Sequence, residues 1–102
     1  MELVPGTIVI YKLRRADCDR ILCRRGQALG GFGSRVQEGD QVPAIVVKAW
    51  SPTNFNGQAF LDGYDSLWLT SVAEGDQPGQ WRRTLQWMVD REEAAEASAK
   101  AN

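Results

Sequence analysis

Apolar and polar residues alternate with the two-residue period of a β-strand in five short segments of the chain. These segments cover about 6–12, 41–50, 58–62, 66–72 and 80–83. Residues 51–57 read as a loop, and turns containing glycine or proline separate the last three segments. The pattern therefore predicts five strands, of which the last four follow one another closely.

Two other segments have the 3.6-residue period of an amphipathic helix. The first runs from about 16 to 25 and has apolar residues at Cys18, Ile21 and Leu22. The second runs from about 85 to 96 and has apolar residues at Leu85, Met88 and Val89. Thr84 can cap this second helix, and we expect its end to fray over residues 98–102.

Short strands with tight turns, and one long excursion after the first strand, are typical of a small β-barrel. The predicted fold is therefore mainly β. An SH3-like barrel fits the order of elements best, and an OB-like barrel is the alternative. We expect residues 1–83 to form the barrel, with a basic, glycine-rich arm over 14–40 that includes the short first helix. Residues 84–102 would form a C-terminal helix and tail.

Length and composition agree with a single globular domain. The chain has 102 residues, of which 43% are apolar and 25% are charged, as in average soluble domains. Its apolar runs are far shorter than the roughly 20 residues of a membrane span. Its first residues lack the basic and apolar regions of a secretory signal. We therefore expect a cytoplasmic protein without a membrane partner.

The absence of histidine from the sequence removes most catalytic constellations. Histidine is the usual general acid or base near neutral pH and the commonest transition-metal ligand. Cys18 and Cys23 are five residues apart on a predicted helix, about 140° from each other, which suits neither a shared metal nor a disulfide. We expect no enzyme activity, no catalytic residues, no cofactor and no metal site, with a pair of carboxylates the one catalytic option left open.

Charge is distributed unevenly although the net charge is only −1. Residues 12–35 carry seven basic and two acidic side chains, whereas residues 52–102 carry four basic and eight acidic ones. A molecule with one basic and one acidic end can steer an anion to the basic end or pair with a second copy of itself.

Part of the sequence resembles a family of small, uncharacterised proteins encoded by bacteriophages and prophages. The resemblance covers about half of the chain, with a weaker match over 5–9, and it rests on EGD at 38–40, VPAIVV at 42–47, Trp50, NGQAFLDG at 56–63, DSLWLTSV at 65–72 and PGQW at 78–81. The family pattern usually ends just after Trp81, whereas this chain continues into the predicted helix. The resemblance implies a phage or prophage origin and a compact β domain, and it implies no activity.

Two of the four tryptophans are out of phase with the aliphatic residues of their strands. If the aliphatic faces line the barrel, Trp50 and Trp68 point outward and form a surface that binds a protein or stacks bases. The alternative is that the arm and the C-terminal helix cover them. Together with the basic arm, the candidate binding residues are Arg24, Arg25, Phe32, Arg35, Trp50, Tyr64, Trp68 and Trp81.

These observations favour a protein-interaction module that self-associates through the edge formed by Leu85, Met88 and Val89. A host or phage protein would be the further partner, so that the module inhibits a host factor or is an accessory component of the virion. The alternative is a protein that sequesters nucleic acid or a nucleotide signal. In that case the arginines of the arm would meet phosphates, and Trp50 or Trp68 would stack on a base.

Overall fold

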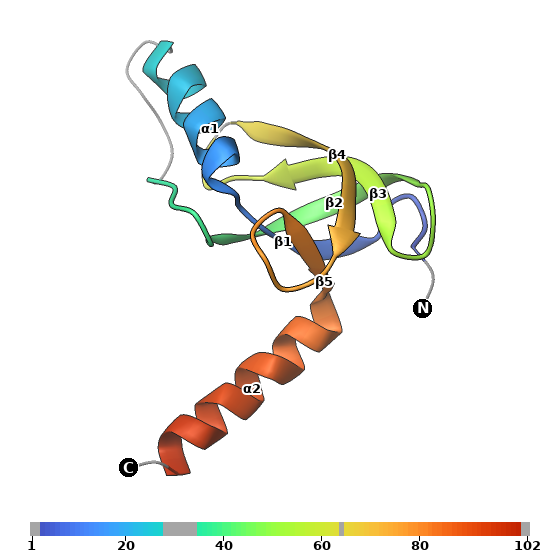
Figure 1. Ribbon diagram of the computed structural model, residues 1–102, viewed down its shortest axis with the longest axis vertical. Coiled ribbons are helices and arrows are strands. Elements are labelled where there is room, and N and C mark those ends of the chain that lie inside the picture. The colour runs from blue at the N-terminus through green and yellow to red at the C-terminus, as the bar shows by residue number, and fades with distance from the viewer. Residues whose placement is uncertain (1–2, 28–34, 64, 101–102) are drawn as a thin grey trace.

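The computed structural model describes residues 3–27, 35–63 and 65–100. Figure 1 shows a barrel with one helix against it and a second helix that projects away from it. In chain order the elements are β1 (Ile8–Lys12), α1 (Arg15–Gln27), β2 (Gln41–Ala49), β3 (Asn54–Phe60), β4 (Ser66–Glu74), β5 (Gln80–Arg83) and α2 (Thr84–Lys100).

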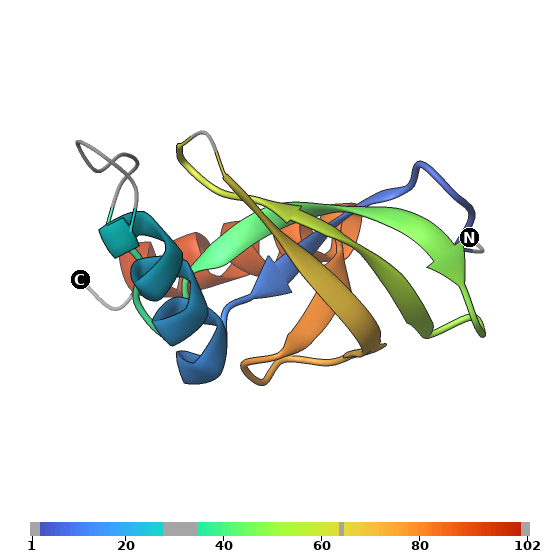
Figure 2. The same ribbon diagram turned by 90° about the horizontal axis from the view of Figure 1, so that it is seen from above.

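The five strands close into a barrel in their sequence order. Neighbouring strands from β1 to β4 are antiparallel, and β5 returns to pair with β1, also antiparallel. The parallel contact between β4 and β5 is short and involves Ala73 and Glu74 of β4. Figure 2 shows the strong twist of these strands and α1 at one end of the barrel. A small SH3- or OB-like barrel with two helices confirms the predicted fold class.

The observed boundaries differ from the predicted ones by up to four residues, most in β3 and α2. β3 begins at Asn54, inside the segment expected to be a loop, because Phe55 is buried in the core and pairs with Ala49 and Val72. The asparagines on either side of Phe55 hide this strand from a search for apolar alternation. Both helices are longer than expected, and α2 continues to Lys100 over the segment expected to fray.

The core lies inside the barrel and under α1. In β4 it takes Leu67 and Leu69, so Trp68 faces outward as the alternation predicts. In β2 the phase is reversed, because Ala44 and Val46 are buried. The larger core side chains are Val9, Tyr11, Leu13, Ile21, Val46, Phe55, Leu67 and Trp81.

Gly57 lies where β2 and β3 leave no room for a side chain. A Cβ atom at this position would lie 2.1 Å from the Ile45 carbonyl oxygen and 2.8 Å from Cε2 of Phe55. The register shifts in both strand pairs that include Gly57. In the β2–β3 pair the shift lies between Val46 and Lys48, and in the β3–β4 pair it lies between Phe55 and Gly57. Such bulges increase local twist and help a short sheet to close.

The two helices relate to the barrel in different ways. α1 buries Cys18 and Ile21 and so completes the core. α2 begins on the barrel, where the Thr84 hydroxyl donates a 2.9 Å hydrogen bond to the Ile8 carbonyl, and its later turns extend away from it. Neither described helix combines the length and apolar character needed to cross a membrane.

Candidate functional site

Two of the predicted binding arginines hold α1 against the barrel. Arg24 and Arg25 lie in the last turn of α1, not in a flexible arm. Arg25 is buried, and its Nε and Nη2 donate hydrogen bonds of 2.9 and 3.0 Å to the Asp65 carboxylate, which lowers the pKa of that carboxyl group. Nη2 of Arg24 donates a 2.8 Å bond to the Ser66 carbonyl. Arg25 is therefore buried in an ion pair and does not face a ligand as expected, whereas Arg24 is exposed and its part in binding stays a prediction.

Trp81 also departs from the predicted surface, because it is fully buried in the core. Its Nε1–H donates a 3.0 Å hydrogen bond to the Thr53 carbonyl, and its ring packs edge-on against Phe55 with 5.7 Å between centroids. Trp81 lies where β5 pairs with β1 to close the barrel, and its large inward-facing ring fills the interior at that point. Phe32 and Tyr64 lie outside the described residues.

Trp50 and Trp68 are at the surface, with 56% and 44% of their area exposed. The Nζ atom of Lys48 lies 4.2 Å from the centroid of the Trp50 ring. Trp50 follows the end of β2 beside Asn54, whereas Trp68 pairs with Gln58, four residues further along β3. Four residues of strand span about 13 Å, so the two indoles belong to different parts of the surface.

Outward-facing apolar residues form a strip across the barrel. The register aligns Ile8 of β1 with Ile45 of β2, Ile45 with Gln58 of β3, and Gln58 with Trp68 of β4. Phe60 is next to Gln58 on the same face of β3 and is half-exposed. We call Ile8, Ile45, Phe60 and Trp68 the apolar strip.

The predicted helix edge lies beside the start of this strip. Leu85 is 69% exposed, and Met88 and Val89 are also exposed. Leu85 and Val89 of α2, with Ile8 of β1, line a groove of about 380 Å³ between the helix and the barrel. The sequence therefore identified an apolar edge that the barrel itself leaves largely uncovered.

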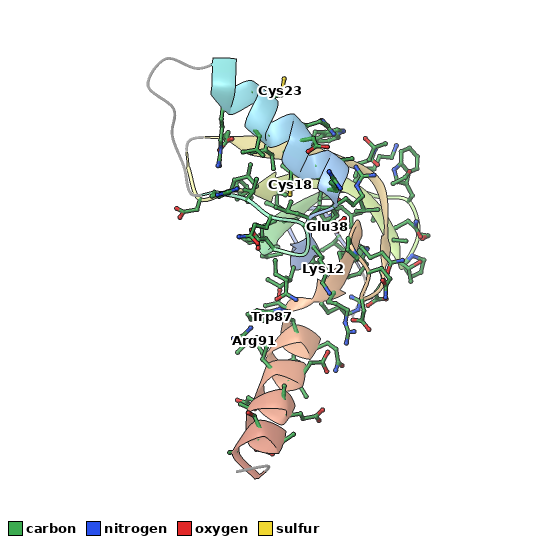
Figure 3. The ribbon with its side chains drawn as sticks, turned by 60° about the vertical axis from the view of Figure 1, so that its left-hand side comes forward. Lys12, Cys18, Cys23, Glu38, Trp87 and Arg91 are labelled. Carbon is green, nitrogen blue, oxygen red and sulfur yellow. The ribbon has the colours of Figure 1, made fainter. Side chains whose placement is uncertain are left out.

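Trp87, on another side of α2, supplies the contact with the barrel. Its Nε1–H donates a 2.5 Å hydrogen bond to Oε1 of Gln41, and the Arg91 guanidinium lies 5.0 Å from its ring centroid. Figure 3 shows Trp87 and Arg91 at the end of α2 nearest the barrel, below Lys12. This contact, the bond from Thr84 to Ile8 and the ion pair of Asp90 with Arg82 of β5 anchor the helix, whereas the apolar edge does not.

Sequence reasoning missed a buried polar cluster at the start of α1. Asp17 is fully buried and accepts hydrogen bonds from the Tyr11 hydroxyl and from the backbone N–H, Nε and Nη2 of Arg14. Burial alone would raise the pKa of Asp17, but the hydrogen bonds from Arg14 and Tyr11 outweigh it and lower that pKa. The available signal was an acidic residue in the first turn of the predicted helix.

Some carboxylates of the acidic half are engaged in ion pairs. Asp76 and Asp90 pair with Arg82, and Glu74 lies 3.5 Å from Arg83. Across residues 3–27, 35–63 and 65–100, no three cysteine or acidic side chains gather closely enough to hold a metal ion.

Comparisons with protein-family models, with curated proteins and with solved structures gave no significant match to this chain. The case for a function therefore rests on the surfaces described above.

Proposed function

We propose that this chain is a non-enzymatic protein-interaction module that self-associates through α2. The observation that carries the proposal is the groove between α2 and β1, in which Leu85 and Val89 stand exposed beside Ile8. Exposed apolar surface that continues from a helix onto a sheet is typical of a protein interface.

The occupant that fits this groove is α2 of a second copy. A helix of 17 residues is marginal without tertiary packing, and the later turns of α2 extend away from their own barrel. The apolar edge occupies only the first two turns of α2. Two such helices that cross antiparallel near Val89 would pack these edges against each other about a twofold axis.

The charge distribution supports the same crossing. Glu92 and Glu96 follow the apolar edge on the same side of α2. Arg83 is the last residue of β5, just before α2 begins, and it lines the groove at the N-terminal end of the apolar edge. An antiparallel crossing near Val89 would bring the two glutamates of each copy toward Arg83 of the other. Opposite charges placed in this way favour the encounter of two copies over repulsion between them.

A dimer of this kind would leave the rest of the apolar strip, with Phe60 and Trp68, for a different protein. The resemblance to phage and prophage proteins supports a host factor or another phage protein as that partner, in the cytoplasm of an infected cell or in the virion. Half-exposed aromatic residues are the side chains that most often contribute strongly to such interfaces.

Light scattering after size-exclusion chromatography tests the self-association. The wild-type chain is expected at about twice the 11.3 kDa of one copy, and Val89→Asp and Met88→Asp are each expected at the mass of one copy. Ala97→Asp is the matched control, because it places the same charge on an exposed part of α2 about 120° from Leu85. A monomeric wild-type chain, or equal loss of mass in the control, would contradict the proposal.

A further inference from the structure

A second hollow, of about 290 Å³, lies between α1, β4 and the turn before β5. It is lined by Tyr11, Arg14, Arg20, Trp68, Leu69, Thr70, Ser71, Val72 and Gly79. The charged residues in this lining are both arginines, so the hollow is electropositive. It is separate from the groove between α2 and β1, so its role is independent of the proposed self-association.

Backbone donors of β4 face this hollow. In an antiparallel ladder, the N–H and C=O groups of one residue point to the same side, and successive residues alternate. The Ser66 carbonyl accepts its bond from Arg24 of α1, so it points away from β3. Trp68 and Thr70 lie two and four residues after Ser66, so their backbone groups point to the same side as those of Ser66. In this part of β4 the neighbouring strand is β3, because β4 pairs with β5 only at Ala73 and Glu74. Their N–H groups, together with their carbonyl groups, are therefore directed away from β3, on the side of β4 where the hollow lies.

The same phase follows from one other contact. The Ser71 N–H donates a 2.7 Å hydrogen bond to Oδ1 of Asn56 on β3, which is the opposite direction to that of Thr70. Ser71 has a φ of 49°, in the left-handed region that residues other than glycine seldom occupy. Backbone in this region is maintained by surrounding structure and is often found at binding sites.

Arg14 is fixed at the rim of the hollow by two contacts. The Asp17 carboxylate accepts bonds of 3.2 Å from its Nε and 2.8 Å from its Nη2. The stem of Arg14 lies so close over Gly79 that a Cβ atom there would be 2.6 Å from Cδ. A guanidinium group has five N–H donors, so the two bonds to Asp17 leave donors for another acceptor, and half of this side chain is exposed.

Arg20 supplies the uncompensated positive charge. It is exposed on α1 one and a half turns after Arg14, and among the described residues it has no hydrogen-bonding or ion-pair partner. Asp17 balances the charge of Arg14, so Arg20 gives the hollow its net charge of +1.

We propose that this hollow binds a small phosphate-bearing ligand. The phosphate oxygens would accept hydrogen bonds from Arg20, from the remaining N–H groups of Arg14 and from the backbone of Trp68 and Thr70. Guanidinium groups and converging backbone N–H groups are the usual donors to phosphate in proteins. The volume is at the small end of the roughly 300–1,000 Å³ of ligand sites, which fits an inorganic phosphate or a mononucleotide better than a polynucleotide.

Calorimetric titration of the full chain with inorganic pyrophosphate and, separately, with ADP tests the site. Amide proton–nitrogen correlation spectra recorded during each titration locate the ligand. We expect saturable binding and the largest shifts at the amides of Trp68 and Thr70. Equal affinity for both probes assigns the site to phosphate groups alone. Tighter binding of ADP that Trp68→Ala abolishes assigns it to a nucleotide.

Arg20→Glu is expected to weaken both probes by about tenfold or more, because it removes a charge-assisted hydrogen bond. Arg15→Glu makes the same charge change on an exposed α1 residue outside the lining of the hollow and is expected to weaken them by less than about twofold. Equal losses in the two variants, or Kd values above about 10 mM for both probes with the wild-type chain, would overturn the proposal.

Discussion

The hydroxyl group of Tyr11 in β1 donates a 2.5 Å hydrogen bond to Oδ2 of Asp17 in α1, and both side chains are fully buried. The same oxygen accepts the backbone N–H of Arg14, at 2.9 Å. The bond therefore joins the barrel to the first turn of the helix that covers it. A buried carboxylate is tolerated when its oxygens accept several hydrogen bonds, as they do here.

Asp17→Ala should destabilise the chain by about 2–4 kcal/mol, because it leaves the buried Tyr11 hydroxyl without its acceptor and removes the bonds to Arg14. Asp19→Ala is the matched control, since Asp19 is exposed on the same helix, and it should change stability by less than about 0.5 kcal/mol. Urea unfolding followed by far-ultraviolet circular dichroism measures both. If the two variants lost similar amounts of unfolding free energy, the hydrogen bonds of Asp17 would not stabilise the fold.

Stability should fall at both extremes of pH. The pKa values of Asp17 and Asp65 are lowered by hydrogen bonds from Arg14 and Arg25, so the stability they contribute is present above about pH 4 and is lost as the pH falls further. The pKa of Tyr11 is raised by burial and by the neighbouring Asp17, so stability should decline as the pH rises above about 10.

Urea midpoints measured between pH 2 and 11 check this profile, with a plateau expected over about pH 5–9. Asp17→Asn should flatten the acid side, because its amide does not titrate. A midpoint that rises as the pH falls from 5 to 3 would be inconsistent with the lowered carboxyl pKa values.

Gly57→Ala should destabilise the barrel by more than about 2 kcal/mol, because its methyl group would meet the Ile45 carbonyl on the neighbouring strand. Gly26→Ala should instead stabilise the chain by about 0.5–1 kcal/mol, since Gly26 is helical and a Cβ atom there has no neighbour within 4 Å. Thermal melts of the two variants give the signs directly. A neutral Gly57→Ala would mean that β2 and β3 can separate at little cost.

Trp81→Phe should cost about 1–3 kcal/mol, because it removes buried volume and one of the two hydrogen bonds that the Thr53 carbonyl accepts. Trp50→Phe, at an exposed position beside Lys48, should change stability by less than about 0.5 kcal/mol. Chemical denaturation of both variants separates the structural tryptophan from the surface one. The prediction fails if the exposed tryptophan proves the costlier to replace.

Alternation along the chain predicted the barrel because strands with one face in the core need apolar residues at every second position. It was sufficient for β4, where Leu67 and Leu69 are inside and Trp68 outside. It failed for β2, where aliphatic residues occupy both faces of the strand. Alternation alone therefore could not decide which face of β2 is buried. The buried side chains there are Ala44 and Val46, because the register with β1 and β3 places these two inside.

Candidate site residues were harder to assign than strands. A cluster of arginines and glycines indicated a binding arm, yet Arg25 is buried against Asp65, a residue forty positions away. The partner of a charged side chain depends on which turns the closed sheet brings together, and sequence spacing does not report it. The same holds for Arg14 and Arg20, which become a candidate site because α1 lies beside β4.

Residue type and local period were enough to predict the number and kind of elements, the absence of histidine chemistry and the apolar edge of α2. They could not show which tryptophans are buried, which arginines are paired or which strand lies beside α1. Those properties depend on contacts between residues distant in the chain. These contacts form when the sheet closes into a barrel and α1 packs against it.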